Sequence, residues 1–324
     1  MVKTNLFFFH PYSGFGGADR SIARVINGLN KKKYKIFFIS ISRPNIKIFI
    51  NKKVTYVRLR SINTIFSINK LYKILKKNIN INQKNILVSN QNFANVLVSF
   101  FFKNRSNLKI VLIERNSIKE LNTNKNSITL VKNFFIKIMM KLYYKHSDLV
   151  ICISKNLSSE IKKFTKARTF TIYNPALDNS IFKKEKKMND SFSHKKNIIL
   201  SIGRLEKQKD QITLLKALNL LKDRLEFFLI ILGYGSLYKE LKNFISVNNL
   251  SQKIRIIRNI KNPNYFLMQS DLFILTSKYE GFGNVLVEAS AKKVPIISSN
   301  CNHGPNEILQ NGKLGMLFKV KNHK

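Results

Sequence analysis

The sequence predicts an α/β protein of two domains, each with a parallel sheet covered by helices on both faces. The chain has 324 residues, which exceeds what one hydrophobic core usually holds and fits two ordinary domains. Short apolar runs of strand length alternate along it with longer amphipathic segments of helical spacing. A polar, lysine-rich stretch without periodicity follows Asn174-Pro175. We therefore expect domains at 1–178 and 196–324, joined by a lysine-rich linker at 179–195.

The first domain is predicted to begin with a strand at 3–10, a glycine turn at 14–17 and a helix at 21–29. Further buried strands are predicted at 33–41, 84–90, 108–114, 147–154 and 168–175. Helical segments lie between several of them, for example at 68–79. Strands that alternate with helices imply a parallel sheet.

The second domain repeats the alternation. A strand and turn are predicted at 197–205, a helix at 211–223, a strand and glycine turn at 225–235, and a helix at 236–250. Shorter elements follow at 253–258, 265–270, 271–277, 284–293 and 294–300. Ligands of such sheets bind at the carboxyl ends of the strands, so the glycine-bearing turns are the first places to search for a site.

The charge is the outlier of the composition, because 58 basic residues stand against 17 acidic ones, a net charge of +41. Such a charge predicts attraction to a nucleic acid or to an anionic lipid surface. A biased genome is a competing cause, since Lys, Asn, Ile and Phe all have AT-rich codons. Residues 1–190 carry +29 and residues 191–324 carry +12, so the positive field belongs mainly to the first half.

Several classes of protein are disfavoured by what the sequence lacks. No apolar run approaches the roughly 18 to 20 residues of a membrane span. The first residues lack the core and cleavage site of a signal peptide, so we expect a cytoplasmic or peripheral protein. Cys152 and Cys301 are far apart and are expected to be reduced and buried. No Asp-x-Asp pair, His-x-x-x-His pair or cysteine pair is present, so we expect neither a metal nor a cofactor.

The stretch YEGFGNVLVEAS, residues 279–290, places two carboxylates eight residues apart around a glycine-rich turn. On one continuous helix, Glu280 and Glu288 would be separated by about 12 Å of rise and about 80° of rotation. Paired glycosidase carboxylates are about 5 to 9.5 Å apart, so a hydrolase dyad is a poor interpretation. The first N–H groups of a helix suit a phosphate, and this helix should begin at Gly281, Phe282, Gly283 and Asn284. The order of carboxylate, backbone amides and carboxylate along this stretch suits a ligand with hydroxyls on both sides of a pyrophosphate. The alternative is one Glu that caps the helix and one on its solvated face.

Two further turns are candidates for chemistry. In SIGRLEKQKD, Arg204 and Lys209 follow a strand and a glycine, where cations could neutralise a pyrophosphate leaving group without a metal. The alternative is a pair of solvated basic residues on an exposed turn. The turn with Gly14, Gly16 and Gly17 resembles a dinucleotide fingerprint but lacks its spacing, so it is weak evidence.

Together these segments resemble the retaining glycosyltransferases of family 4. EGFGNVLVEASAKKVPIISS (280–299) resembles the family's E-x7-E motif, and it occurs in the right order with GRLEKQKDQITLLKAL (203–218), LGYGSLYKEL (232–241) and GPNEILQNGKLGML (304–317). GGADRSI (16–22) resembles the family's glycine-rich turn, and SDLVICISKNL (147–157) and IYNP (172–175) resemble the strand and the exit to the linker. The resemblance covers nearly all the chain. It implies the GT-B architecture, two Rossmann-like domains facing across a cleft.

The resemblance also implies roles for particular residues. Glu288 would bond the ribose hydroxyls of a nucleotide, and Glu280 would contact hydroxyls of the donor sugar. Arg204 and Lys209 would neutralise the departing diphosphate, whose own oxygen would accept the acceptor's proton, so no carboxylate nucleophile is needed. The implied backbone contacts to the donor come from Gly16, Gly17, Gly233, Gly281, Phe282, Gly283, Asn284 and Val285.

The sequence departs from the family at three points. Many members have a first-domain His near the donor sugar, whereas the corresponding strand end here, IERNSIKEL, offers Glu114, Arg115 and Asn116. Of these, Glu114 and Asn116 are the expected contacts. We treat these two and His10 as possible acceptor or sugar contacts. The family's KG is KD at Lys209-Asp210. The family usually continues for several tens of residues beyond LFKVKNHK (317–324), so the second domain is expected to be incomplete.

A basic amphipathic helix is predicted at 128–146, and such a helix can lie on an anionic membrane. Its lysines and apolar residues recur at helical spacing: Lys132, Lys137, Lys141 and Lys145, among Phe134, Phe135, Ile138, Met139, Leu142 and Tyr143. An ordinary core helix with solvated lysines is the alternative.

The sequence thus predicts a retaining, metal-independent hexosyltransferase that uses a nucleotide diphosphate sugar, with UDP as the expected nucleotide. The sugar, a hexosyl or N-acetylhexosaminyl unit, would pass to a growing cell-surface glycan, with a lipid-linked acceptor as one candidate. Polysaccharide or lipopolysaccharide biosynthesis at the inner face of the cytoplasmic membrane is the expected setting. Two alternatives stay open: an inactive, truncated sugar-nucleotide-binding protein, and a nucleic-acid-binding protein that only the charge suggests.

Overall fold

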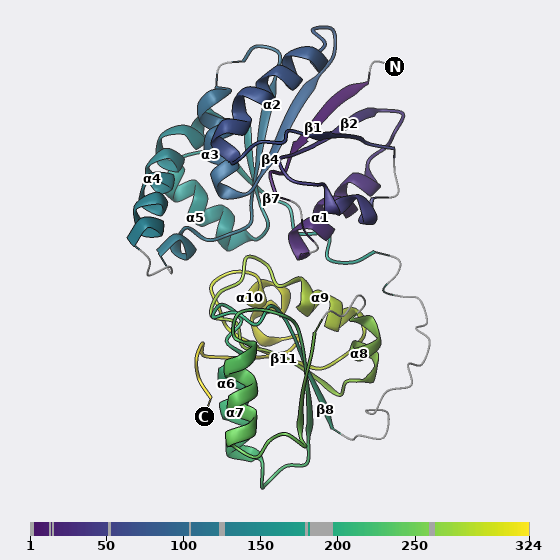
Figure 1. Cartoon of the computed structure of the whole chain (residues 1–324), viewed down its shortest axis with the longest axis vertical. Coiled ribbons are helices and arrows are strands. Elements are labelled where there is room, and N and C mark those ends of the chain that lie inside the picture. The colour runs from purple at the N-terminus through teal and green to yellow at the C-terminus, as the bar shows by residue number, and fades with distance from the viewer. Residues whose placement is uncertain are drawn as a thin grey trace. The chain divides into compact units, whose positions relative to one another are not determined.

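The computed structural model describes residues 3–12, 14, 16–50, 53–103, 105–122, 127–178, 181, 197–258 and 263–323. The chain forms two compact units, Met1–Pro175 and Ala176–Lys324 (Figure 1). Apart from Ile181, the predicted linker at 179–195 lies outside the described residues. The predicted boundaries at 178 and 196 remain predictions.

The first unit contains a seven-stranded parallel sheet in the order β3-β2-β1-β4-β5-β6-β7. Its strands are β1 (Thr4–Phe9), β2 (Tyr34–Ser40), β3 (Thr55–Arg58), β4 (Asn85–Asn90), β5 (Lys109–Glu114), β6 (Leu149–Cys152) and β7 (Thr169–Thr171). All six predicted strands are confirmed. The sequence does not predict β3, because only Tyr56 and Val57 in its middle are apolar, which is too short a run to indicate a strand.

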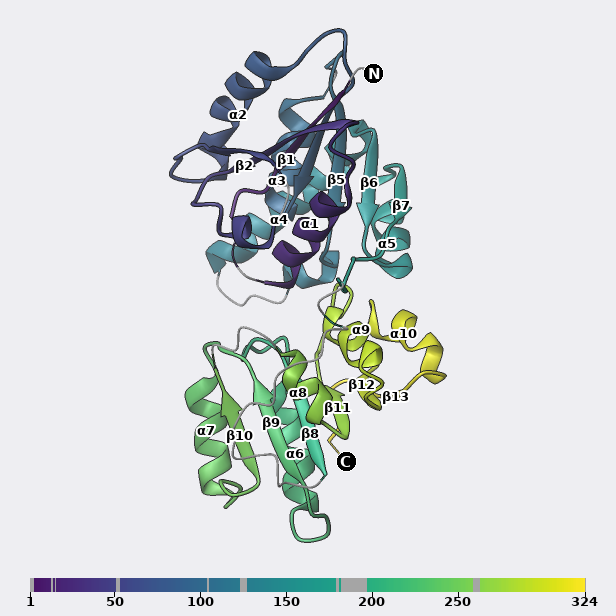
Figure 2. The same ribbon diagram turned by 90° about the vertical axis from the view of Figure 1, so that its right-hand side faces the viewer.

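Helices cover both faces of this sheet (Figures 1 and 2). They are α1 (Gly17–Gly28), α2 (Thr64–Asn78), α3 (Asn92–Phe101), α4 (Ser127–Tyr143) and α5 (Lys155–Thr165). The core beside α1 joins Leu6 and Phe8 of β1 to Ile22 and Ile26 of the helix. Helices α2, α3 and α4 contact one another in succession. Because both faces are covered, the strands read as continuous apolar runs rather than as alternating ones.

The second unit contains a six-stranded parallel sheet in the order β10-β9-β8-β11-β12-β13. Its strands are β8 (Ile198–Ile202), β9 (Phe228–Leu232), β10 (Ile254–Ile257), β11 (Leu272–Leu275), β12 (Ile296–Ser299) and β13 (Met316–Phe318), and its helices are α6 (Gln211–Leu221), α7 (Tyr238–Val247), α8 (Asn264–Gln269), α9 (Asn284–Ala291) and α10 (Pro305–Ile308). The elements predicted from 197 to 300 are confirmed.

The two faces of this sheet build two separate apolar cores. Ile198 and Leu200 of β8 point to the face covered by α8 and α9, and Ile199 points to the face covered by α6 and α7 (Figure 2). This alternation follows from the two-residue period of a strand. Each fully buried side chain of this kind contributes roughly 1.5 to 3 kcal/mol of transfer free energy. The rigid double layer fixes the loops at the carboxyl edge of the sheet.

Candidate functional site

The strand order of the second unit reverses its direction between β8 and β11. Strands β9 and β10 lie on one side of this point, and β12 and β13 lie on the other. A crevice for a ligand forms at the carboxyl ends of the two strands where an open parallel sheet reverses its order. The loops 203–210 after β8 and 276–283 after β11 therefore flank the candidate site.

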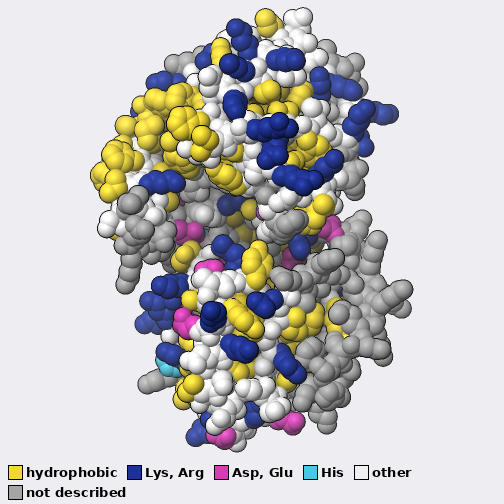
Figure 3. Space-filling view, in the orientation of Figure 1, with side chains coloured by type: hydrophobic (Ala, Val, Ile, Leu, Met, Phe, Trp, Pro, Cys, Tyr) yellow, Lys and Arg dark blue, Asp and Glu magenta, His cyan; other side chains and the backbone are white. Residues whose placement is uncertain are grey.

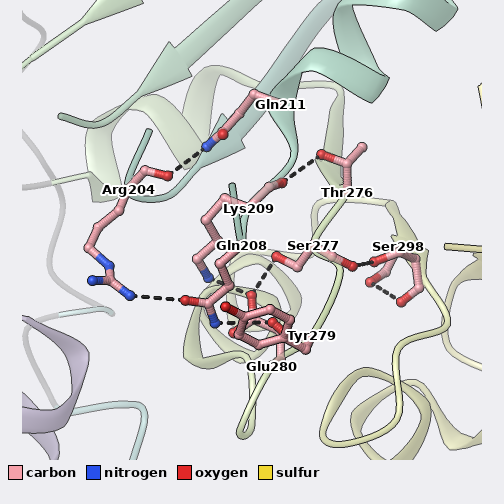
Figure 4. Close-up of polar contacts among 10 residues, drawn as sticks. Arg204, Gln208, Lys209, Gln211, Thr276, Ser277, Tyr279, Glu280 and Ser298 are labelled. Atoms are coloured by element: carbon pink, nitrogen blue, oxygen red, sulfur yellow. Dashed lines mark hydrogen bonds and ion pairs between the residues drawn. The ribbon is translucent and has the colours of Figure 1, made fainter. Parts of the chain in front are cut away.

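These two loops are joined by backbone and side-chain hydrogen bonds. The amide of Lys278 donates to the carbonyl of Gln208 at 2.8 Å, and the Gln208 side-chain amide donates to the carbonyl of Tyr279 at 3.1 Å. The Thr276 hydroxyl donates to the carbonyl of Lys209 at 3.0 Å. Residues some 70 positions apart in the sequence are thereby held side by side, as Figure 4 shows. The loops form one unit of structure rather than two mobile segments.

Lys209 and Glu280 form an ion pair at the centre of the joined loops. Lys209 Nζ lies 2.5 Å from Glu280 Oε1, and the side chains are only 14% and 7% exposed (Figure 4). The hydroxyl of Ser277 donates to the same carboxylate oxygen at 2.6 Å, and Ser299 in turn donates to the carbonyl of Ser277 at 2.6 Å. Removing one partner of such a sheltered pair leaves an uncompensated charge, which costs about 3 to 5 kcal/mol when burial is complete.

Arg204 lies on the same loop but is exposed. Its guanidinium donates to the side-chain oxygen of Gln208 at 3.0 Å, and its carbonyl accepts from the side chain of Gln211 at 3.0 Å (Figure 4). The Gln208 side chain thus bridges Arg204 and the β11 loop. Two cations and one carboxylate are therefore held on a single loop pair, where they can meet an anionic ligand.

Helix α9 begins immediately after the glycine-rich turn. Gly283 precedes its first residue with a φ of 97°, a left-handed conformation that glycine adopts without steric cost. Glu280 lies before the helix and Glu288 lies in its second turn, so the two carboxylates do not share one helix. Val285 packs partly against the core, which leaves its backbone, not its side chain, for a ligand. The first amides of a helix have no carbonyl of a preceding turn to bond.

Two glycines hold this site by close backbone packing. A Cβ at Gly233, at the end of β9, would overlap the carbonyl oxygen of Gly203, at the end of β8. A Cβ at Gly304 would overlap the carbonyl oxygen of Phe282, and Gly304 also has a φ of 84°. Gly233, predicted as a donor contact, therefore has a structural role that is visible without a ligand. The donor contact itself remains a prediction.

In the first unit, the predicted residues lie at the carboxyl ends of β1 and β5. Gly16 precedes α1 and Gly17 is its first residue. His10 is only 2% exposed, and both of its ring nitrogens have partners within the unit, Asp19 and Asn90. Its buried ring is therefore suited to positioning the turn, and the expected contact of His10 with a ligand remains a prediction.

Glu114 is also buried, whereas Asn116 is exposed. The carboxylate of Glu114 accepts from the Tyr144 hydroxyl at 2.5 Å and from the Asn95 side chain at 2.7 Å. Burial raises the pKa of Glu114 to about 7, against the opposing effects of Tyr144, Asn95 and the charge of Arg115. The Glu114 carboxylate has no exposed surface in this conformation, and the expected sugar or acceptor contacts of Glu114 and Asn116 remain predictions.

The described residues also bear on metal and thiol chemistry. Within them, no group of three or more His, Cys, Asp or Glu side chains is arranged to hold a metal ion. Cys152 and Cys301 are both free and buried, and burial raises the pKa of each thiol to about 12. Both cysteines are therefore protonated packing residues at neutral pH.

The sequence interpretation missed the residues that orient the predicted ones. Gln208, Ser277 and Ser299 carry no motif of their own, because their roles depend on contacts between distant loops. Asp19 could have been found, since an acidic residue three positions after Gly16 at a helix start is a capping pattern. Asn90 follows a buried strand, so its place at a carboxyl end was a second available signal.

Comparison with known proteins agrees with this geometry. Residues 182–324 match the family model described as glycosyl transferases group 1. The chain is 28% identical, over 99% of its length and 87% of the relative's, to the Campylobacter jejuni N-acetylgalactosamine-N,N'-diacetylbacillosaminyl-diphospho-undecaprenol 4-alpha-N-acetylgalactosaminyltransferase. It is 26% identical to the Staphylococcus aureus capsular polysaccharide biosynthesis glycosyltransferase CapH, over 82% of the chain and 70% of the relative.

A solved structure shows the same fold. Anabaena Alr3699/HepE in complex with UDP and glucose aligns with a TM-score of 0.76 and 16% identity, covering 98% of this chain and 86% of the other. Residues 182–324 match the glycosyl transferases group 1 family, and the chain has two parallel-sheet α/β domains along its length, which is the GT-B fold.

Proposed function

We propose that this protein is a glycosyltransferase that moves a hexosyl or N-acetylhexosaminyl unit from a UDP-sugar to a growing cell-surface glycan, with retention of the anomeric configuration. The observation that carries the proposal is the Lys209–Glu280 pair, which places a sheltered cation and carboxylate on the loops that flank the switch point of the second sheet. The name of the solved HepE complex, with UDP and glucose, is in keeping with a nucleotide sugar.

The chemistry follows from the charges on these loops. Arg204 and Lys209 stabilise the negative charge that develops on the departing diphosphate, and the first amides of α9 add backbone donors. The carboxylate of Glu280 orients Lys209 and accepts from sugar hydroxyls, while Glu288 accepts from the ribose. A leaving phosphate oxygen takes the proton of the acceptor hydroxyl, so that the C–O bond to phosphate breaks as the new glycosidic bond forms. No metal is required for this charge balance.

The acceptor class is proposed from the relatives' names. The Campylobacter relative is named for a diphospho-undecaprenol acceptor, and the staphylococcal relative is named for capsular polysaccharide biosynthesis. We therefore propose a lipid-linked glycan as the acceptor. The setting would be polysaccharide or lipopolysaccharide assembly at the inner face of the cytoplasmic membrane.

UDP is expected to stabilise the purified protein against thermal unfolding, and one UDP-sugar is expected to do so more strongly than the others. A ligand at 100 times its Kd adds about 2.7 kcal/mol to the folded state. The measurement is a thermal shift across UDP, UDP-glucose, UDP-galactose, UDP-N-acetylglucosamine and UDP-N-acetylgalactosamine, each with and without EDTA. Glu288→Gln should reduce the shift given by UDP, and EDTA should leave the shift unchanged.

Each arm of this measurement can contradict a part of the proposal. If no compound shifts the unfolding temperature, the protein has no nucleotide-sugar site. If EDTA abolishes the shift, binding depends on a metal ion. Donor binding without release of UDP, tested with lipid-linked and soluble glycan acceptors, would favour an inactive sugar-nucleotide-binding protein instead.

The second part of the proposal concerns the outward face of α4. Leu130, Val131, Phe134, Phe135, Ile138 and Leu142 are 39% to 60% exposed, whereas Ile136 and Met140 are buried in the core. The helix therefore has two apolar stripes, one toward the core and one toward solvent, unlike an ordinary core helix. Figure 3 shows the outer stripe as part of a broad hydrophobic field over α3 and α4.

The charge around this face favours an anionic partner. Helices α2, α3 and α4 contain no Asp or Glu, while α4 carries Lys132, Lys137 and Lys141. Each lysine near an anionic leaflet contributes about 1 kcal/mol of attraction. No helix of the described residues is long and apolar enough to cross a membrane. We propose that the face of α4 docks on the surface of an anionic bilayer.

The double variant Phe134→Ser, Phe135→Ser is expected to weaken binding to phosphatidylglycerol vesicles by about 30-fold. Both rings are 60% exposed, and losing the burial of two such rings costs about 2 kcal/mol. Cosedimentation measures the partition coefficient. Phe170→Ser, Ile172→Ser, with 59% and 49% exposure elsewhere on the same unit, is the matched control. Equal loss in both variants would argue against an α4-specific face.

A further inference from the structure

The carboxyl ends of β1 and β4 mark the switch point of the first sheet. Strands β2 and β3 lie on one side of β1, and β4 to β7 lie on the other. By the same physical rule that locates the site of the second unit, a ligand crevice is expected there. His10 follows β1, Asn90 ends β4 and Arg115 follows β5. Three neighbouring strands thus bring polar side chains to one place.

These side chains form an unbroken chain of hydrogen bonds. Arg115 donates from Nη1 to Asn174 Oδ1 at 2.7 Å and from Nε to Asn90 Oδ1 at 2.8 Å. Asn90 Nδ2 lies 2.7 Å from His10 Nδ1, and His10 Nε2 lies 3.0 Å from Asp19 Oδ1. His10, Asn90 and Asp19 are 2%, 2% and 7% exposed.

The direction of every bond in this chain is set by Arg115. A guanidinium only donates, so the side-chain oxygen of Asn90 must face Arg115 and the amide nitrogen must face His10. The Nδ1 atom of His10 then accepts, and its Nε2–H donates to Asp19. One tautomer of the neutral imidazole satisfies every group. Burial lowers the pKa of Arg115 to about 10, against the opposing charges of Asp19 and Glu114, so the guanidinium is still protonated at neutral pH.

This series of hydrogen bonds ends on the backbone of the turn between β1 and α1. The amides of Gly14 and Gly16 donate to Asp19 Oδ1 and Oδ2 at 2.9 and 3.0 Å. Burial acts to raise the pKa of Asp19, but the hydrogen bonds from His10 and Gly14, with others, outweigh it and lower the pKa below its ordinary value. The carboxylate is therefore ionised, and it holds the turn from the side of α1.

A second contact holds the same turn from the side of β4. The side-chain amide of Gln91 donates to the carbonyl of Tyr12 at 2.9 Å. Gln91 itself has a φ of 93°, a conformation that costs a residue with a Cβ about 1 to 3 kcal/mol. Its side chain reaches Tyr12 from this strained backbone. Residues with strained backbone conformations are found more often at active sites and ligand-binding sites than elsewhere.

We propose that Asp19, Asn90 and Arg115 are positioning residues, which fix the turn between β1 and α1 in the conformation that glycosyl transfer requires. His10 is the uncharged link between them. The expected effect on turnover rests on the proposed function. The hydrogen bonds that hold the turn do not depend on it. Because a displacement of about 1 Å can cost a factor of about 100 in rate, a clamp on two backbone amides has a measurable effect.

Asp19→Asn is the first test, because the carboxamide keeps the shape but loses one acceptor. We expect faster hydrogen exchange in a peptide covering 10–20, and at least about tenfold slower release of UDP from the UDP-sugar of the panel above that stabilises the wild type most. The thermal shift given by UDP should be unchanged. Asp148→Asn is the matched control, since Asp148 also accepts a backbone amide, that of Ile110 at 2.8 Å, and pairs with Lys109.

Asn90→Asp and Asn90→Ala test the order of donors. An aspartate at 90 still accepts from Arg115 but cannot donate to Nδ1 of His10, so the link between residue 90 and the imidazole is lost. The groups that face His10 are Asp19 from α1, Arg115 through residue 90, and the apolar ring of Phe38 from β2 at 6.0 Å. Turnover of both Asn90→Asp and Asn90→Ala should fall below that of the wild type, with faster hydrogen exchange in the peptide covering 10–20.

The outcomes separate this inference from the proposed function. A folded Asp19→Asn with wild-type hydrogen exchange and turnover would overturn the clamp, as would wild-type hydrogen exchange and turnover in Asn90→Asp. If the wild type gives no thermal shift with UDP, the proposed function fails, and hydrogen exchange still decides whether Asp19 holds the turn.

Discussion

Glu280→Gln is expected to slow the release of UDP from the cognate donor by about 100-fold or more. The carboxamide has the shape of the carboxylate but no charge, so Lys209 loses the partner that lies 2.5 Å away and Ser277 loses a strong acceptor. Removing one preorganised group at the reacting charge costs about 10² to 10³ in rate in well-studied enzymes. Steady-state kinetics with the cognate donor measures the loss.

Glu206→Gln is the matched control for this change. Glu206 lies on the loop that carries Lys209, and its carboxylate accepts from both the amide and the hydroxyl of Ser236 at 2.9 and 2.8 Å. Its variant should keep turnover within about twofold, since its carboxylate lies on an exposed contact away from Lys209. A double variant of Lys209→Met with Glu280→Gln should be little slower than either single variant if the pair acts as a unit. Unchanged turnover in both Glu280→Gln and Glu288→Gln would remove the assignment of the site.

Gly233→Ala is expected to destabilise the second unit by about 3 kcal/mol or more. The new Cβ would overlap the carbonyl oxygen of Gly203, and the atoms around it are backbone that cannot turn away. Overpacking of a tightly packed site costs about 1 to 3 kcal/mol, and a backbone clash lies at the upper end. Denaturant unfolding of the second unit measures the loss.

The same variant is expected to lose stabilisation by UDP even where it stays folded, because Gly203 begins the loop that carries Arg204 and Lys209. Gly28→Ala is the control, since a Cβ at Gly28 meets nothing within 4 Å. That control should be neutral or slightly stabilising, because alanine favours the helical backbone more than glycine does. Equal stability of Gly233→Ala and Gly28→Ala would show that the loop moves aside at no cost.

Much of the fold could be predicted because its signals are local. The apolar run at Leu6–Phe9 is buried on both faces of a sheet, and its short length before a glycine turn is typical of a buried strand. The start of α9 was predicted from Gly283, whose left-handed backbone ends one segment and begins the next. Strand β3 was missed, because four half-exposed residues leave no pattern that exceeds chance.

The candidate site was only partly predictable. Lys209 and Glu280 were each predicted to meet a ligand, and their pairing with each other was not foreseen. The reason is that Glu280 lies 71 residues beyond Lys209, and the hydrogen bonds that join their loops depend on the register of β8 against β11. The contact between His10 and Asn90 was not foreseen for the same reason, since Asn90 lies 80 residues away in the sequence.

The sequence by itself determined the two α/β units, the order of most of their elements and the family of the second unit. Those features depend on periodicity and on short motifs, which any segment carries within itself. Only the tertiary structure decided which charges are sheltered, which glycines touch backbone, and which polar side chains hold the turns instead of facing a ligand. These are consequences of distance and burial between segments far apart in the chain. No local pattern encodes a contact that forms only when two strands lie side by side.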